Sequence, residues 1–196
     1  MELIREDYLK LIRPYYNVDL IKVITGVRRS GKSVLMETIK NEIISNGIKG
    51  SHVISINLED LDYAFITDVK DLYTEIVSHI TDKEKYYIFL DEIQHVQNFE
   101  KLLASLRAKF NCSIFVTGSD STMLSGDLAT LLTGRTVEFE IFPFSFKESV
   151  DFLCAGWRPH RGCRQPLWRL LQPHHPHAGH AGHHQHHRQR EQSRRP

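Results

Sequence analysis

The run Gly26-Val-Arg-Arg-Ser-Gly-Lys-Ser33 constrains the fold of this chain more than any other feature of the sequence. It follows residues 20–25, whose branched side chains predict a strand, and it precedes residues 34–45, whose apolar spacing predicts a helix. A glycine-rich loop that ends in Gly-Lys-Ser between a strand and a helix is typical of a phosphate-binding loop. These flanks disfavour the alternative, a glycine-rich turn that binds nothing.

Each position of this loop has a physical reason. Glycine at 26 and 31 permits tight turns and a close approach of the backbone to an anion. Backbone N–H groups of the loop and of the helix N-terminus would face phosphate oxygens. The lysine neutralises terminal phosphates, and the last serine hydroxyl is placed to coordinate Mg²⁺. Arg28 and Arg29 either meet phosphate or DNA or are solvated loop residues. The predicted phosphate-binding residues are Gly26, Val27, Arg28, Arg29, Ser30, Gly31, Lys32, Ser33 and Val34.

A second motif is the acidic pair Asp91-Glu92 at the end of the apolar run Tyr87-Ile-Phe-Leu. A buried parallel strand delivers its last residues to the carboxyl edge of the sheet, beside a phosphate-binding loop. We expect Asp91 to hold Mg²⁺ through water, and Glu92 to orient and deprotonate an attacking water. The alternative is an acidic pair that is simply solvated.

Strand and helix patterns alternate along the chain. Strands are predicted at 20–25, 52–57, 86–91, 113–117 and 136–142, and helices at 1–16, 34–45, 69–80, 99–110 and 121–133. This alternation predicts an α/β fold with a parallel sheet and helices on both faces.

The combined motifs resemble those of AAA+ type ATPases, and more narrowly a prokaryotic group in which the AAA domain precedes a C-terminal domain of unknown function. The matching stretches are Val23–Ser33, Leu90–Gln94, Phe115–Ser119, Leu132–Arg135 and Pro143–Glu148. The resemblance implies a P-loop NTPase three-layer sandwich, with a parallel five-stranded sheet of order 5-1-4-3-2. It also implies ATP as ligand and a larger full-length protein.

Two further roles come from this resemblance. Ser119, or less favourably Thr117, fits the polar sensor at the end of the fourth strand, although a turn residue bonded to local backbone is an equal alternative. Arg135 either acts as an arginine finger on a neighbouring subunit of a homo-oligomer or caps a helix end or pairs with a carboxylate.

Residues 155–196 differ in composition from the rest of the chain. They contain eight of the arginines and nine of the 12 histidines, one acidic residue, and no Ile, Val, Phe or Lys. Such a segment has too little to bury to fold. We therefore expect an AAA+ type core at 1–153, with a short N-terminal helix, and a disordered tail at 154–196. The tail is either the product of a shifted reading frame, which would remove the lid and the C-terminal domain, or a polybasic arm for nucleic acid.

The sequence thus predicts a Mg²⁺-dependent core that binds ATP and hydrolyses it weakly for lack of a lid. One alternative is a nucleotide-regulated switch for DNA or a protein partner with negligible turnover. A small-molecule kinase is less favoured, because the adjacent Asp91 and Glu92 favour water as acceptor. No apolar run reaches the roughly 18 residues of a membrane span, and the cysteine content favours a reduced, cytoplasmic protein.

Overall fold

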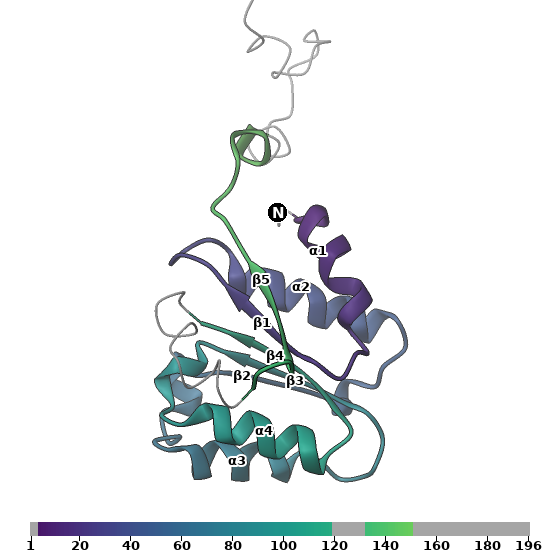
Figure 1. Ribbon diagram of the computed structural model, residues 1–196, viewed down its shortest axis with the longest axis vertical. Helices are drawn as coiled ribbons and strands as arrows, with labels where there is room; N and C mark the ends of the chain where they lie inside the picture. Colours follow the sequence, from purple (N-terminus) through teal and green to yellow (C-terminus); the bar gives the residue numbers. More distant parts are fainter. Residues whose placement is uncertain (1–3, 119–131, 151–196) are drawn as a thin grey trace, which may run out of the picture.

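Five parallel strands form the centre of the molecule (Figure 1). The computed structural model describes residues 4–118 and 132–150. Within them the sheet order is β2-β3-β4-β1-β5, which is 5-1-4-3-2 read from the other edge, and the predicted topology is confirmed. The strands are β1 (Ile21–Thr25), β2 (Val53–Asn57), β3 (Tyr86–Asp91), β4 (Cys112–Thr117) and β5 (Thr136–Glu140).

Helices cover both faces of this sheet, as predicted for a three-layer sandwich. Helices α1 and α2 lie on one face, and α3 and α4 lie on the other (Figure 1). Their bounds are α1 (Glu6–Ile12), α2 (Lys32–Ser45), α3 (Val69–Ser78) and α4 (Phe99–Lys109). Short 3₁₀ turns occupy Arg13–Tyr15, Gly50–His52, Leu61–Tyr63 and Ile93–His95.

The core is divided by the sheet into two apolar layers. In β3 the side chain of Phe89 packs among α1 and α2 residues, whereas those of Ile88 and Leu90 belong to the layer under α3 and α4. Every residue of β1 and β3 is buried. Strands that are buried on both faces read as continuous apolar runs, which is why these two were evident in the sequence.

The ends of the helices differ from the prediction where glycine or proline controls the backbone. The predicted helix at 34–45 begins two residues earlier, at Lys32, because Gly31 is its N-cap in the left-handed region at φ 94°. The predicted helix at 1–16 is a two-turn α1 that continues into a 3₁₀ turn containing Pro14. Proline removes one N–H and is tolerated at the start of such a turn.

The last predicted elements are described only in part. The predicted strand at 136–142 ends at Glu140, and Phe142 is exposed. Of the predicted helix at 121–133 only Leu132 and Thr133 are described, and they form a bend and a turn. The predicted tail at 154–196 lies outside the described residues. Among the described helices, all are too short or too polar to cross a membrane.

Candidate functional site

The loop between β1 and α2 turns tightly under the constraint of its two glycines. Gly26 has φ 141°, and a Cβ atom added there would lie 2.2 Å from the carbonyl oxygen of Ile141. Gly31 has φ 94°, and the non-glycine Arg29 also has a positive φ, of 65°. Position 26 therefore accepts only glycine. Its backbone has a positive φ, and a side chain would collide with the segment after β5.

The N-terminus of α2 is open toward this loop. Helix α2 has 14 residues, and no side chain caps its first N–H groups. By contrast, the start of α3 carries a capping box in which Asp68 and Asp71 satisfy these groups. Uncapped N–H groups together with the helix dipole make the start of α2 suitable for an anion.

Lys32 lies beneath the loop. Its residue is 5% exposed, and its Nζ donates to the carbonyl oxygens of Gly26 at 3.0 Å and Val27 at 3.4 Å. The ammonium therefore lies against the loop backbone at the first turn of α2. There its charge adds to the positive end of the helix dipole.

Ser33 and Asp91 line one cavity although they come from different elements. Ser33 belongs to the first turn of α2, and Asp91 is the last residue of β3. The cavity has a volume of about 190 Å³, and its remaining wall is formed by Met36, Glu37, Ser55, Ile56, Asn57 and Phe89. Hydroxyl, carboxylate and amide oxygens are the donors that Mg²⁺ accepts, so the oxygen-bearing side chains on this wall suit that ion, whereas Met36, Ile56 and Phe89 do not.

Thr117 fixes the acidic pair. Its hydroxyl donates to Oδ1 of Asp91 and accepts from the backbone N–H of Glu92 at 2.9 Å. Thr117 is fully buried and Asp91 is 8% exposed. The last residue of β4 thus determines how the last residue of β3 presents its carboxylate.

Glu92 follows in a strained conformation. Its backbone is left-handed at φ 54°, and Nε2 of Gln94 donates to its carboxylate at 2.5 Å. Non-glycine residues in this region cost on the order of 1–3 kcal/mol and persist only where the surroundings impose them. Oε1 of Gln94 is buried and has no hydrogen-bond partner among the described residues.

The other predicted loop residues divide into exposed and buried ones. Arg28 and Arg29 are exposed, and the side chains of Val27 and Val34 are about half exposed. Ser30 is 2% exposed, and its hydroxyl has no partner among the described residues. The two arginines therefore extend from the outer side of the loop, while Ser30 faces the domain.

Arg135 lies at the amino-terminal end of the parallel strands, whereas the loop lies at their carboxyl-terminal end. It precedes β5, and its carbonyl oxygen accepts from the N–H of Ile21, at the start of β1. The loop between β1 and α2 follows the end of β1, and a five-residue strand spans about 16 Å. The structure therefore does not bring Arg135 to the loop of its own chain. The predicted sensor Ser119 lies outside the described residues.

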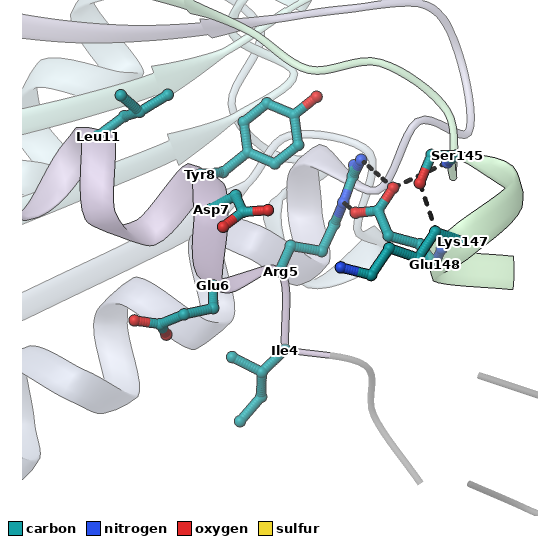
Figure 2. Close-up of a pocket in the computed structure, with 9 residues that line it drawn as sticks. All are labelled: Ile4, Arg5, Glu6, Asp7, Tyr8, Leu11, Ser145, Lys147 and Glu148. Carbon is teal, nitrogen blue, oxygen red and sulfur yellow. Dashed lines mark hydrogen bonds and ion pairs between the residues drawn. The ribbon is translucent and has the colours of Figure 1, made fainter. Parts of the chain in front are cut away.

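Sequence reasoning missed Arg5, which lies before α1 and contacts the loop. Its Nη1 donates to the carbonyl oxygen of Ser30 at 2.9 Å, and its Nε donates to Glu148 at 2.9 Å. Figure 2 shows Arg5 pointing from the start of α1 toward Glu148 and Ser145. All three residues line a hollow of about 560 Å³. The only signal in the sequence was an arginine in an otherwise acidic N-terminal stretch.

Glu148 is held by more than the arginine. Its carboxylate accepts from the backbone N–H of Ser145 at 2.8 Å, and its own N–H donates to the hydroxyl of Ser145 at 3.2 Å. This capping box starts a helical turn at Phe146. Partial burial raises the pKa of Glu148, but the hydrogen bonds from Arg5 and Ser145 outweigh it and keep the pKa below its usual value.

The fold and the loop together define a P-loop NTPase-like protein. The family model described as AAA domain matches residues 19–150, and the chain belongs to the AAA domain family. Membership indicates a P-loop NTPase-like, nucleotide-binding function.

Relatives extend well beyond this chain. An uncharacterized protein of Haemophilus influenzae is 43% identical over 145 residues, which are 74% of this chain and 36% of that protein. An uncharacterized protein of Methanocaldococcus jannaschii is 39% identical over 134 residues, which are 67% of this chain and 28% of that protein. The chain thus spans about a third of the length of these curated relatives.

Among solved structures, the crystal structure of Saccharomyces cerevisiae RIF2 is similar with a TM-score of 0.54. The similarity covers 82% of this chain and 64% of that one at 16% identity, so it concerns the fold alone.

Proposed function

We propose that this domain binds ATP with Mg²⁺ and hydrolyses it slowly to ADP and phosphate. The observation that carries the proposal is the uncapped start of α2 at the end of the glycine-rich loop. It lies next to the cavity that Ser33 and Asp91 line. An uncapped helix start, which favours an anion, thus lies next to oxygen donors of the kind that a hard cation accepts. A nucleoside triphosphate with its magnesium ion has this combination of charges.

In this proposal the loop binds the phosphates. Backbone N–H groups from Gly26 to Val34 surround them, and Lys32 exchanges its two backbone carbonyl partners for phosphate oxygens. Ser33 and Asp91 would hold the magnesium ion, the latter through water. When bound, this ion neutralises charge that develops on the transferred phosphoryl group.

Glu92 would serve as the general base. A water molecule attacks the γ-phosphorus, the bond to the β–γ bridging oxygen breaks, and Glu92 accepts a proton from the water. The short Gln94 contact holds the carboxylate before the reaction. Ser119 stays a proposed sensor for the attacking water.

Arg135 would act only on another subunit. Its place at the amino edge of the sheet supports a role on a neighbour's nucleotide and none on its own. An arginine supplied in trans contributes about 10³–10⁵ in rate, so an isolated domain should turn over slowly. A missing lid would slow it further, because water is then not excluded.

A nucleotide-regulated switch is the second proposal. It is favoured by the resting contact between Glu92 and Gln94, which occupies the proposed base, and by the exposed Arg28 and Arg29. Such a switch would bind ATP, change its affinity for DNA or a protein, and release little phosphate.

Calorimetric titration with ATP and Mg²⁺ tests the binding step. Lys32→Ala should weaken binding by about 10- to 150-fold, because a charge-assisted contact is worth about 1.5–3 kcal/mol. Lys109→Ala is the control, since Lys109 is exposed at the end of α4 and contacts the hydroxyl of Tyr73 in α3, at the other end of the sheet. Equal ATP affinity in the wild type and Lys32→Ala would contradict the nucleotide site.

A further inference from the structure

Arg5 connects the phosphate-binding loop to two segments that are far from it in sequence. It is separated by 25 positions from Ser30, whose carbonyl oxygen it binds, and by 143 positions from Glu148, its ion-pair partner. Its side chain is 5% exposed. A guanidinium has several donors in a rigid fork, so one arginine can hold two acceptors in fixed directions.

Two aromatic rings complete the surroundings of the guanidinium. Its central carbon lies 4.4 Å from the ring centroid of Tyr8 and 5.2 Å from that of Phe144. The hydroxyl of Tyr8 accepts from the N–H of Phe142, in the extended segment after β5. The arginine is therefore fixed from α1, from this extended segment and from the turn at Glu148.

The bond to Ser30 has a consequence for the next N–H group. A trans peptide unit is planar, so the carbonyl of Ser30 and the N–H of Gly31 point in opposite directions. Because Arg5 holds the carbonyl toward α1, the N–H of Gly31 is directed away from α1. Gly31 is the N-cap of α2, and its N–H belongs to the group that the proposed function assigns to phosphate.

We propose that Arg5 is a positioning residue for the phosphate-binding loop: it fixes the Ser30–Gly31 peptide so that the Gly31 N–H faces the ligand's phosphates, and Glu148 keeps Arg5 in place. This inference rests on the proposed nucleotide binding. It adds that phosphate affinity depends on a segment after β5 that does not itself touch phosphate. By linkage, a bound nucleotide stabilises the Arg5–Glu148 pair to the same extent.

The molecule contains a matched control for this arrangement. Arg13 also joins an α1 residue, Glu6, to a second element through Glu42 of α2. Its network resembles that of Arg5 in chemistry, but Arg13 bonds to two carboxylates and not to the carbonyl oxygen of Ser30. Arg13→Ala should therefore lower the thermal midpoint without changing ATP affinity.

The test measures the dissociation constants of Mg²⁺-ATP and of Mg²⁺-tripolyphosphate for the full chain, well below its thermal midpoint. Arg5→Ala should weaken both ligands about tenfold, as expected for loss of a preorganised hydrogen-bond donor. Glu148→Gln should weaken both by a smaller factor. Arg5→Lys should also weaken both, because one ammonium does not replace the fork.

Three results would overturn the inference. One is ATP affinity within twofold of wild type in Arg5→Ala. Another is a loss for ATP with tripolyphosphate unchanged, which would place Arg5 at the nucleoside. The third is an equal loss in Arg13→Ala, which would indicate general destabilisation. If Arg5→Ala does not fold, Glu148→Gln and Arg5→Lys decide in the same way. Failure of the wild type to bind either ligand would instead contradict the proposed function itself.

Discussion

The hydroxyl of Thr117, the last residue of β4, donates a hydrogen bond to the carboxylate of Asp91, the last residue of the neighbouring strand β3. The same oxygen accepts from the N–H of Glu92, so one buried hydroxyl holds both acidic residues. Thr117 was the less favoured of two sensor positions in the sequence. These contacts support a positioning role that we propose for Thr117, which is to orient Asp91 and Glu92.

Replacing this hydroxyl should disturb both residues. Thr117→Val keeps the shape but leaves the carboxylate of Asp91 and the N–H of Glu92 without this partner. We expect the free energy of unfolding to fall by about 1–3 kcal/mol, together with at least about tenfold slower phosphate release. Thr117→Ser keeps the hydroxyl and should retain most of both. Urea unfolding and phosphate release at saturating ATP measure the effects, and wild-type turnover in Thr117→Val would refute this role.

Glu92→Gln should separate binding from hydrolysis. The amide keeps the size of the side chain but does not take a proton from water, so ATP affinity should persist while kcat falls about 10²–10⁴-fold. Glu84→Gln, at an exposed position before β3, serves as the control. Unchanged phosphate release in Glu92→Gln would mean that the base lies elsewhere.

Gly26→Ala should be far more damaging than another glycine substitution at positive φ. The added Cβ would lie 2.2 Å from the carbonyl oxygen of Ile141, whereas at Gly47, with φ 96°, nothing lies within 4 Å. We expect Gly47→Ala to cost about 1–2 kcal/mol of stability and to spare ATP binding. Gly26→Ala should cost more and abolish binding. Unfolding curves and calorimetry of both variants decide, and normal ATP affinity in Gly26→Ala would show that the contact with Ile141 yields easily.

Lys22 should make stability depend on pH. It is fully buried in β1, and its Nζ donates to the carbonyl oxygen of Val18 at 2.7 Å and to the hydroxyl of Ser113 at 2.6 Å. Burial, followed by repulsion from Lys85, lowers the pKa of Lys22 to about 7. Between this value and the ordinary pKa near 10.5, the unfolded chain binds the extra proton. The contribution of Lys22 is therefore most favourable above about 10.5 and is lost as the pH falls toward 7.

Lys22→Met should remove this dependence. Relative to wild type, the variant should gain stability at pH 7, on the order of a few kcal/mol at most. The gain should vanish or reverse at pH 10, where the neutral lysine keeps its two hydrogen bonds. Urea unfolding from pH 6.5 to 10 measures the difference between the two proteins, in which the titration of shared tyrosines and Cys112 largely cancels. A difference independent of pH would contradict the assignment.

Strong local patterns made much of the fold predictable. The apolar runs of β3 and β4 identified two strands of the sheet, because continuous burial requires apolar side chains at adjacent positions. The Gly-Lys-Ser ending identified the loop, because its glycine requirements also fall within a few adjacent residues. Helix α2 began earlier than predicted, since the left-handed Gly31 ends the loop and starts the helix in one residue.

The supporting contacts of the site were not predictable in this way. Arg5 and Glu148 meet across 143 positions. Glu148 ends one of the stretches that carry the family resemblance, but nothing in that stretch indicates Arg5 as its partner. The left-handed backbone of Glu92 and its contact with Gln94 depend on how the chain leaves β3, which composition does not encode. Such pairings come from tertiary packing, where sequence patterns carry little information.

Ile141 and Glu148 lie late in the sequence, so the ribosome adds them long after it has made the glycine-rich loop that they contact or support. The loop is made early, but the acid that holds Arg5 is translated 143 residues after it. At common rates of synthesis this interval lasts roughly 7 to 30 s. During that time β1 lacks its neighbour β5, and the loop lacks the carbonyl against which Gly26 packs. A ribosome-bound chain stalled before residue 136 would therefore contain the complete glycine-rich motif. It would lack the contacts on which, in our proposal, phosphate binding by the complete domain depends.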